Sequence, residues 1–171
     1  MYFQVDGATA GTIRGTITFA GKKPAGRVIS MDADAQCAKL HPGGKVTEEG
    51  ILLGAKGAVG NVFVYLKTGL EGKKFAPAKE PVVMEQKGCL FAPQVAGMQT
   101  GQPIKVVNAD PVTHNIHPQP HENRDWNQSQ APDDPPLLRK FTVPEIMIPV
   151  KCNVHKWMHA WIGVLDHPYF A

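Results

Sequence analysis

Short stretches in which apolar and polar residues alternate recur along the chain, and turns rich in Gly and Pro separate them. The stretch 11–21, GTIRGTITFAG, has this period of two, with Ile13, Ile17 and Phe19 on one face. Alternation of this kind is typical of a half-buried β-strand. The stretch 60–69, GNVFVYLKTG, carries apolar residues on both faces, so we expect a central strand of a packed sheet.

Further strands are predicted at residues 81–89, 101–110, 143–152 and 161–167. Within VPEIMIPVKC the alternation places four residues on one face: Ile146, Ile148, Val150 and Cys152. The stretch DADAQCAKLH, residues 32–41, is a candidate for a short helix. Many short strands joined by such turns indicate an all-β fold, and we expect a Greek-key β-sandwich.

A length of 171 residues fits one domain, which we expect to span residues 11–171 with an extended N-terminal portion. Residues 1–10 are left out of this domain because YFQ resembles the remnant of a cleavable tag, and we expect a disordered start. Residues 117–140 are rich in proline and hold few apolar anchors. We therefore expect one long loop there, close to a functional site.

The composition restricts the classes of function. The formal net charge of +3 is weak and dispersed, which argues against nucleic acid as a partner. No apolar run is long enough to cross a membrane, and the first residues lack the basic and apolar regions of a signal peptide. Together with the tag-like start, this predicts a mature chain whose leader is absent. We expect an exported protein, periplasmic or extracellular, on the grounds of the possible disulfide and the family resemblance given below.

Three cysteines are present, and their odd number leaves one unpaired in any scheme of internal disulfides. If Cys152 binds a metal, Cys37 and Cys89 are free to form a disulfide, which would indicate an oxidising compartment. Closing that loop would stabilise the fold by about 4 kcal/mol on the chain-entropy model. The alternative is that both are ordinary small buried residues. The bridge is the interpretation we prefer.

The segment KCNVHKWMHAW places a cysteine, two histidines and a methionine close together. A strand end with Cys152, followed by a tight loop with His155 and Met158, brings a thiolate, an imidazole and a thioether to one point. A further ligand is available from VNADPVTHNIH, which offers His114 or His117. One Cys and two His in a trigonal arrangement with a weak axial Met define a type 1 copper site. Taken singly, each of these residues is also common in cores or at surfaces.

These segments resemble the ligand loops of the cupredoxins, the blue copper family of plastocyanin, azurin and amicyanin. CNVHKWM has an amicyanin-like spacing, and NADPVTHN resembles the plastocyanin-like turn that ends in His-Asn. The resemblance implies one copper ion bound by His114, Cys152, His155 and Met158. It also implies that Asn115 ties the two ligand loops together and points its backbone N–H at the thiolate sulfur. With its long first third and the ending GVLDHPYFA, the chain is similar to larger exported bacterial cupredoxin-like proteins.

The other histidines and the tryptophans have competing interpretations. His117 is the rival of His114, but three residues apart on an extended segment the two point to opposite faces. A less favoured interpretation is an accessory metal site formed by His117, His121 and His159. Around His155 we expect a small exposed docking surface for a redox partner. Its residues are Lys156, Trp157 and Trp161. The alternative is that the tryptophans cover the end of the sandwich.

The resemblance implies a monomeric electron carrier with one Cu(I)/Cu(II) ion and a transient redox partner, such as a cytochrome or a copper or haem enzyme. The alternative is a copper carrier or store without a role in electron transfer. An enzyme is not expected, because copper oxidases and nitrite reductases need further ligands, commonly from His-x-His pairs, which this sequence lacks. A His2Cys zinc site is a further alternative, but methionine as the fourth group favours copper.

Overall fold

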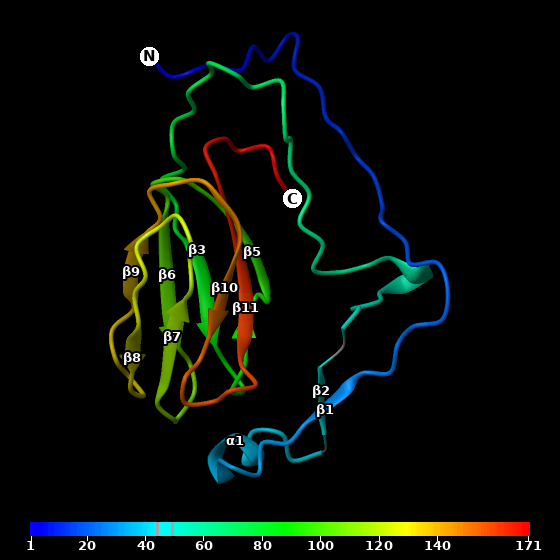
Figure 1. The fold of residues 1–171 in the computed structure, drawn as a ribbon, viewed down its shortest axis with the longest axis vertical. Coiled ribbons are helices and arrows are strands. Elements are labelled where there is room, and N and C mark those ends of the chain that lie inside the picture. Colours follow the sequence, from blue (N-terminus) through cyan, green and yellow to red (C-terminus); the bar gives the residue numbers. More distant parts are fainter. Residues whose placement is uncertain (44, 49) are drawn as a thin grey trace.

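The computed structural model describes residues 1–43, 45–48 and 50–171. Within these residues the chain forms the strands β1 to β11, the short helix α1 and a 3-10 helix, η1 (Figure 1). No helix in this described part of the chain is both long enough and apolar enough to span a membrane. With eleven strands and only two short helical elements among the described residues, regular structure is mainly β-strand, as the alternating pattern predicts.

Two sheets pack face to face as a β-sandwich (Figure 1). The five-stranded sheet has the order β5 (Val95–Gln99), β11 (His159–Leu165), β10 (Glu145–Lys151), β7 (His114–Pro118) and β8 (Gln128–Gln130). The four-stranded sheet has the order β4 (Phe91–Ala92), β3 (Val82–Gln86), β6 (Pro103–Asn108) and β9 (Leu137–Lys140). The pairs β11–β5 and β3–β6 are parallel, and the other pairs in these sheets are antiparallel. The predicted all-β sandwich is confirmed.

The hydrophobic core lies between the two sheets and follows the period of two. In β6 the buried positions alternate with partly exposed ones, and Ile104 and Val106 are fully buried. In β11 the alternation ends after Trp161, and residues 162–165 are all buried, with Ile162 and Val164 completely so. Further fully buried side chains from both sheets are Met84, Met98, Ile116 and Ile148. The alternating strands thus supply the apolar surface that holds the sandwich together.

The two strands predicted in the first third of the chain are not formed. Residues 11–21 make only an isolated bridge at Thr18, and the side chain of Ile13 is 88% exposed. Residues 60–69 likewise make only a bridge, at Tyr65. Both predictions were wrong, because alternation yields a strand only where a neighbouring strand pairs with the backbone N–H and C=O groups.

The first third instead contains four short elements. Strands β1 (Arg27–Ile29) and β2 (Val46–Glu48) form an antiparallel pair. Between them lies α1 (Ala35–Lys39), inside the stretch predicted as a short helix, and η1 (Ala55–Gly57) follows. The helix begins after Asp34, whose side chain accepts hydrogen bonds from the first backbone N–H groups. Most of the remaining chain up to β3 runs in extended or irregular form outside the sandwich (Figure 1).

The alternation predicted for β10 holds over only part of the strand. The register against β11 shifts between Glu145 and Ile148, and Met147 has a φ of 60°. As a result Ile146 is 40% exposed and does not share the buried face of Ile148, contrary to the prediction. An irregularity of this kind changes the side to which the preceding residues point, and periodicity alone does not reveal it.

Residues 117–140 do not form the single long loop that the prolines suggest. They contain the end of β7 and the whole of β8 and β9. Strands β8 and β9 each lie at the edge of a sheet. The prediction was wrong because prolines between short strands are compatible with pairing at a sheet edge.

The candidate ligands lie at one end of the sandwich. The connection from β6 to β7 leads into His114, and the connection from β10 to β11 begins with Cys152. Both connections lie at the lower end of the sandwich in Figure 1, and α1 lies beneath the same end. Three segments that are far apart in the sequence therefore meet there.

Candidate metal centre

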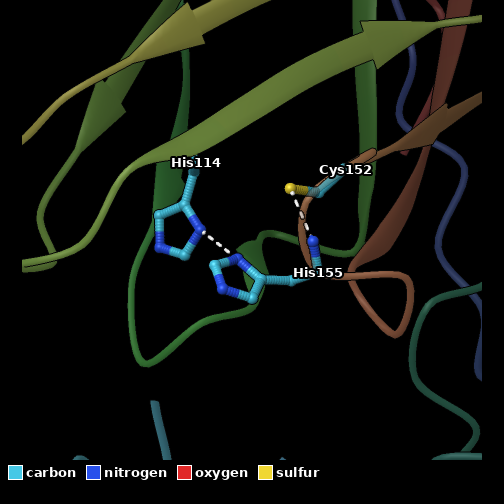
Figure 2. A group of neighbouring side chains, drawn as sticks. All are labelled: His114, Cys152 and His155. Atoms are coloured by element: carbon cyan, nitrogen blue, oxygen red, sulfur yellow. Dashed lines mark hydrogen bonds between the residues drawn. The ribbon is translucent and has the colours of Figure 1, made fainter. Parts of the chain in front are cut away.

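His114, Cys152 and His155 come together at this end of the sandwich (Figure 2). Each offers one metal-ligating atom, and these atoms lie within 4.8 Å of one another. All three side chains are buried. The structure thus brings a thiol and two imidazoles together, although Cys152 and His155 follow His114 by 38 and 41 residues in the sequence. Because the residues are buried, water is largely excluded from this group.

The loop that follows β10 is closed by short-range hydrogen bonds. The Cys152 N–H donates to the Met158 carbonyl oxygen at 3.2 Å, and the Met158 N–H donates to the His155 carbonyl oxygen at 2.9 Å. The His155 N–H donates to the Sγ atom of Cys152 at 3.3 Å. The side chain of Met158 is fully buried on this loop. The loop therefore holds Cys152, His155 and Met158 in one compact turn.

Asn115 connects the two ligand loops. Its backbone N–H donates to the Sγ atom of Cys152 at 3.5 Å. Its side-chain oxygen accepts a hydrogen bond from the Asn153 N–H, and its amide donates to the side chain of Asn127. The Cys152 sulfur thus has two backbone N–H groups directed at it, from Asn115 and His155.

His114 is oriented by a buried carboxylate. Its Nε2 atom lies 2.8 Å from Oδ2 of Asp110. Asp110 is itself fixed by the backbone N–H groups of Gly88 and Cys89, each at 2.7 Å. Burial of the ring lowers the pKa of His114, although Asp110 acts in the opposite direction. Because a carboxylate accepts a hydrogen bond, Nε2 of His114 carries the proton and Nδ1 presents a lone pair.

His155 is oriented in the same way by a residue from the N-terminal third. Its Nε2 atom lies 3.1 Å from Oδ2 of Asp34. The hydrogen bond from His155, together with the Cys37 N–H, holds the pKa of the Asp34 carboxyl below its ordinary value. The Nδ1 atom of His155 lies 2.9 Å from Nδ1 of His114 (Figure 2). The two Nδ1 atoms therefore face each other at a distance that a shared proton or a metal ion could bridge.

Contrary to the prediction, the edge of the His155 ring is not exposed. The residue is only 2% exposed, because Asp34 and the Cys37–Cys89 disulfide lie against its ring. Trp157 is partly buried, with its ring centroid 5.0 Å from that of His155 and its Nε1–H donating to the Cys89 carbonyl oxygen. Of the predicted docking residues, Lys156 and Trp161 are exposed. The expectation of an exposed surface centred on His155 was therefore wrong.

The three histidines considered for a rival or accessory site, His117, His121 and His159, do not join this centre. His117 contacts Asp125 and Asn153, His159 contacts Glu48, and His121 is exposed. Among the described residues, these histidines belong to none of the groups that could hold a metal ion. The structure places His114 rather than His117 beside Cys152.

Two residues of the centre were missed by the sequence analysis. Asp110 lies four residues before His114, and this spacing within NADPVTH is a signal that was available. Asp34 lies 121 residues before His155, and its sequence context indicates only the start of a helix. A long-range contact of this kind has no signature in a single sequence.

Neither protein-family models nor curated proteins give a match to this chain. Similar solved structures include a copper-containing nitrite reductase from Thermus scotoductus, with 19% identity and a TM-score of 0.47 over 59% of this chain. This chain spans about a quarter of that enzyme, since 25% of its length is covered.

Two smaller proteins are also similar in structure. A mutant of amicyanin has 14% identity and a TM-score of 0.44, over 51% of this chain and 84% of that protein. A purple cupredoxin from Nitrosopumilus maritimus has 16% identity and a TM-score of 0.42, over 48% of this chain and 98% of that protein. With TM-scores below 0.5, these similarities are not evidence about the candidate metal centre.

Proposed function

We propose that this chain is a mononuclear type 1 copper protein that carries single electrons between redox partners. The observation that carries the proposal is the arrangement of the two imidazoles beside the buried thiol of Cys152. His114 and His155 each direct Nε2 at a carboxylate, and their Nδ1 atoms face each other at 2.9 Å. Two lone pairs in this position repel each other unless a proton or a metal ion lies between them, and a proton would leave the sulfur of Cys152 without a partner ion. A metal ion would satisfy both nitrogens and the adjacent sulfur.

The chemistry of the donor set favours copper. Thiolate and thioether groups suit Cu(I), whereas imidazole suits both oxidation states. Met158 supplies a buried thioether on the same loop as Cys152 and His155. A Cys and two His with a weak Met ligand is the set found in type 1 copper sites, and it is not a usual structural zinc set.

The residues of the chain would keep the site rigid. Bound copper would accept and return one electron. The backbone hydrogen bonds of the ligand loop and the Asn115 contacts hold the donor atoms in place. Burial excludes water from the three ligands. Donors that move little between the two oxidation states keep the reorganisation small, which is what rapid electron transfer requires.

We further infer an exported, monomeric protein with a transient redox partner. The Cys37–Cys89 disulfide supports export, because such bonds persist in oxidising compartments. Transient redox encounters use small interfaces. The exposed Lys156 and Trp161 remain candidates for such a contact, whereas the buried edge of His155 does not.

Addition of one equivalent of Cu(II) to the metal-free protein tests the proposal. We expect an intense charge-transfer band in the red region and a narrow copper hyperfine splitting in the electron paramagnetic resonance spectrum. Cys152→Ala should abolish the band, because the thiolate is its source. His117→Ala is the matched control and should keep the band, because His117 lies outside the ligand group.

Retention of the full band in Cys152→Ala would refute the ligand assignment. A pale spectrum with wide splitting in the parent protein would also contradict the proposal. That result would instead support a copper carrier or store with an ordinary His-rich site. The two spectra together therefore separate the two functions.

A further inference from the structure

Residues 31–41, called the cap segment below, reach the candidate centre from the N-terminal third. Cys37 of this segment is bonded to Cys89, and the ring of His41 contacts the Gly88 carbonyl oxygen at 2.8 Å. The Sγ atom of Cys37 also lies 3.5 Å from Nε2 of His155. The cap segment is thus fixed to the turn between β3 and β4, and it covers the outer edge of a candidate ligand.

The two carboxylate oxygens of Asp34 have separate contacts. Oδ1 accepts hydrogen bonds from the Gln36 and Cys37 N–H groups, at 2.8 and 3.2 Å, and so caps the start of α1. Oδ2 lies 3.1 Å from Nε2 of His155. The first contact fixes the position of the carboxylate, and the second points it at the candidate ligand. Because the contacts use different oxygens, a substitution can remove one and keep the other.

We propose that Asp34 is a positioning residue for His155 and lowers the reduction potential of the copper site. This inference rests on the proposed function, because it requires copper on the Nδ1 side of the ring. A carboxylate that holds the remote N–H of a ligating imidazole fixes the ring and raises its basicity. A more basic ligand and an adjacent negative charge both stabilise Cu(II) more than Cu(I).

The carboxylate that contacts His155 comes from outside the sandwich, unlike the one that contacts His114. Asp110 serves His114 from within the sandwich, four residues away in the sequence. Asp34 instead belongs to a segment that is held against the sandwich by the Cys37–Cys89 disulfide. The N-terminal third would therefore control a property of the metal site, and it would replace solvent at the edge of His155.

Three variants separate this role from the capping of α1. Asp34→Asn keeps the cap, because Asn is as good a capping residue as Asp, but it removes the negative charge. Asp34→Ser also keeps a capping oxygen, and its shorter side chain does not reach His155. The matched control is Asp32→Asn, which removes an exposed carboxylate of the same segment whose partner is the Ser30 hydroxyl.

The copper-loaded variants are compared with the parent protein by reduction potential and by pulsed electron paramagnetic resonance of the remote imidazole nitrogen. We expect both Asp34 variants to weaken Cu(II) binding relative to Cu(I) by about tenfold, which raises a one-electron potential by about 59 mV. The modulation that the remote imidazole nitrogen produces in the pulsed spectrum should change together with the potential. Asp32→Asn should change neither quantity.

An unchanged potential and modulation in both Asp34 variants would overturn the role of Asp34. If the parent protein still shows the type 1 band, the proposed function would stand in that case. A parent protein without the band would overturn both the function and this inference. The parent spectrum therefore distinguishes the two failures.

Discussion

At the scale of single residues, the thiol, the pair of imidazoles and the thioether are held in three different ways. The Cys152 sulfur has two backbone N–H groups directed at it, and each imidazole has a carboxylate at Nε2. Met158 is held by packing, since its side chain is fully buried and its backbone closes the loop. A thioether is a weak axial ligand that tunes the potential of a type 1 site.

We predict that Met158→Gln retains copper but lowers the reduction potential. The amide oxygen is a harder donor than the thioether, so it stabilises Cu(II) more than Cu(I). Voltammetry of the copper-loaded protein measures the change. Met147→Gln, on the partly exposed part of β10, is the control and should leave the potential unchanged. Equal potentials in the parent and in Met158→Gln would show that Met158 does not fill the axial position.

At the scale of secondary-structure elements, a single carboxylate anchors the chain between β7 and β8. Glu145, at the start of β10, accepts hydrogen bonds from the backbone N–H groups of His121, Glu122 and Asn123. Its pKa lies below the ordinary value of 4.5: burial acts to raise it, but the donors of His121, Asn123 and Glu122 outweigh burial. The ionised form is therefore favoured by folding.

We predict that Glu145→Gln lowers the free energy of unfolding at pH 7 by about 1 kcal/mol, because the hydrogen bonds lose their charged acceptor. A lowered folded pKa gives stability that is present above the unfolded pKa and is lost as the pH falls through the folded pKa. The difference between parent and variant should therefore shrink from pH 7 to pH 3. Urea unfolding of the metal-free proteins at both pH values measures it.

The exposed carboxylate of Glu122 offers the matched control for this experiment. Glu122→Gln should change the unfolding free energy by less than about 0.5 kcal/mol at either pH, as for most surface substitutions. A difference for Glu145→Gln that is the same at both pH values would contradict the role of the charge.

At the scale of the whole molecule, the chain that precedes β3 contacts the sandwich at several places. One is the cap segment beside His155, and another is Phe63, which lies against the backbone of Gly97 in β5 and Gly163 in β11. Phe63 also packs against Phe170 near the C-terminus, with ring centroids 5.8 Å apart. A sheet face with glycines on adjacent strands thus accepts an aromatic side chain from outside the sandwich.

We predict that Gly163→Ala destabilises the protein by about 1–3 kcal/mol, because the added methyl group overlaps the ring of Phe63. The thermal midpoint should fall by about 2–4 °C per kcal/mol. Gly15→Ala is the control, because an added Cβ there meets no atom within 4 Å. An unchanged midpoint in Gly163→Ala would show that Phe63 does not need this position.

The candidate ligands were predictable from the sequence because their information is local. Cys152, His155 and Met158 lie within one short loop, and the residue after His114 distinguishes it from His117. The strands β3 and β6 were predictable because the period of two matches the burial of their side chains. Strand β11 was predictable as a short apolar stretch, and its residues 162–165 are all buried. The same pattern misled for 11–21 and 60–69, where pairing partners are lacking along most of the stretch.

The sequence alone indicates the main strands of the sandwich, the candidate ligand loop with its thiol, imidazole and thioether groups, and the cysteines available for a bridge. The packing of distant segments places Asp110 and Asp34 at the two imidazoles and covers the edge of His155. Asp34 and His155 are 121 residues apart, and their contact depends on the whole path of the N-terminal third. Local patterns record which chemistry a residue can perform, whereas its partners depend on how distant segments pack.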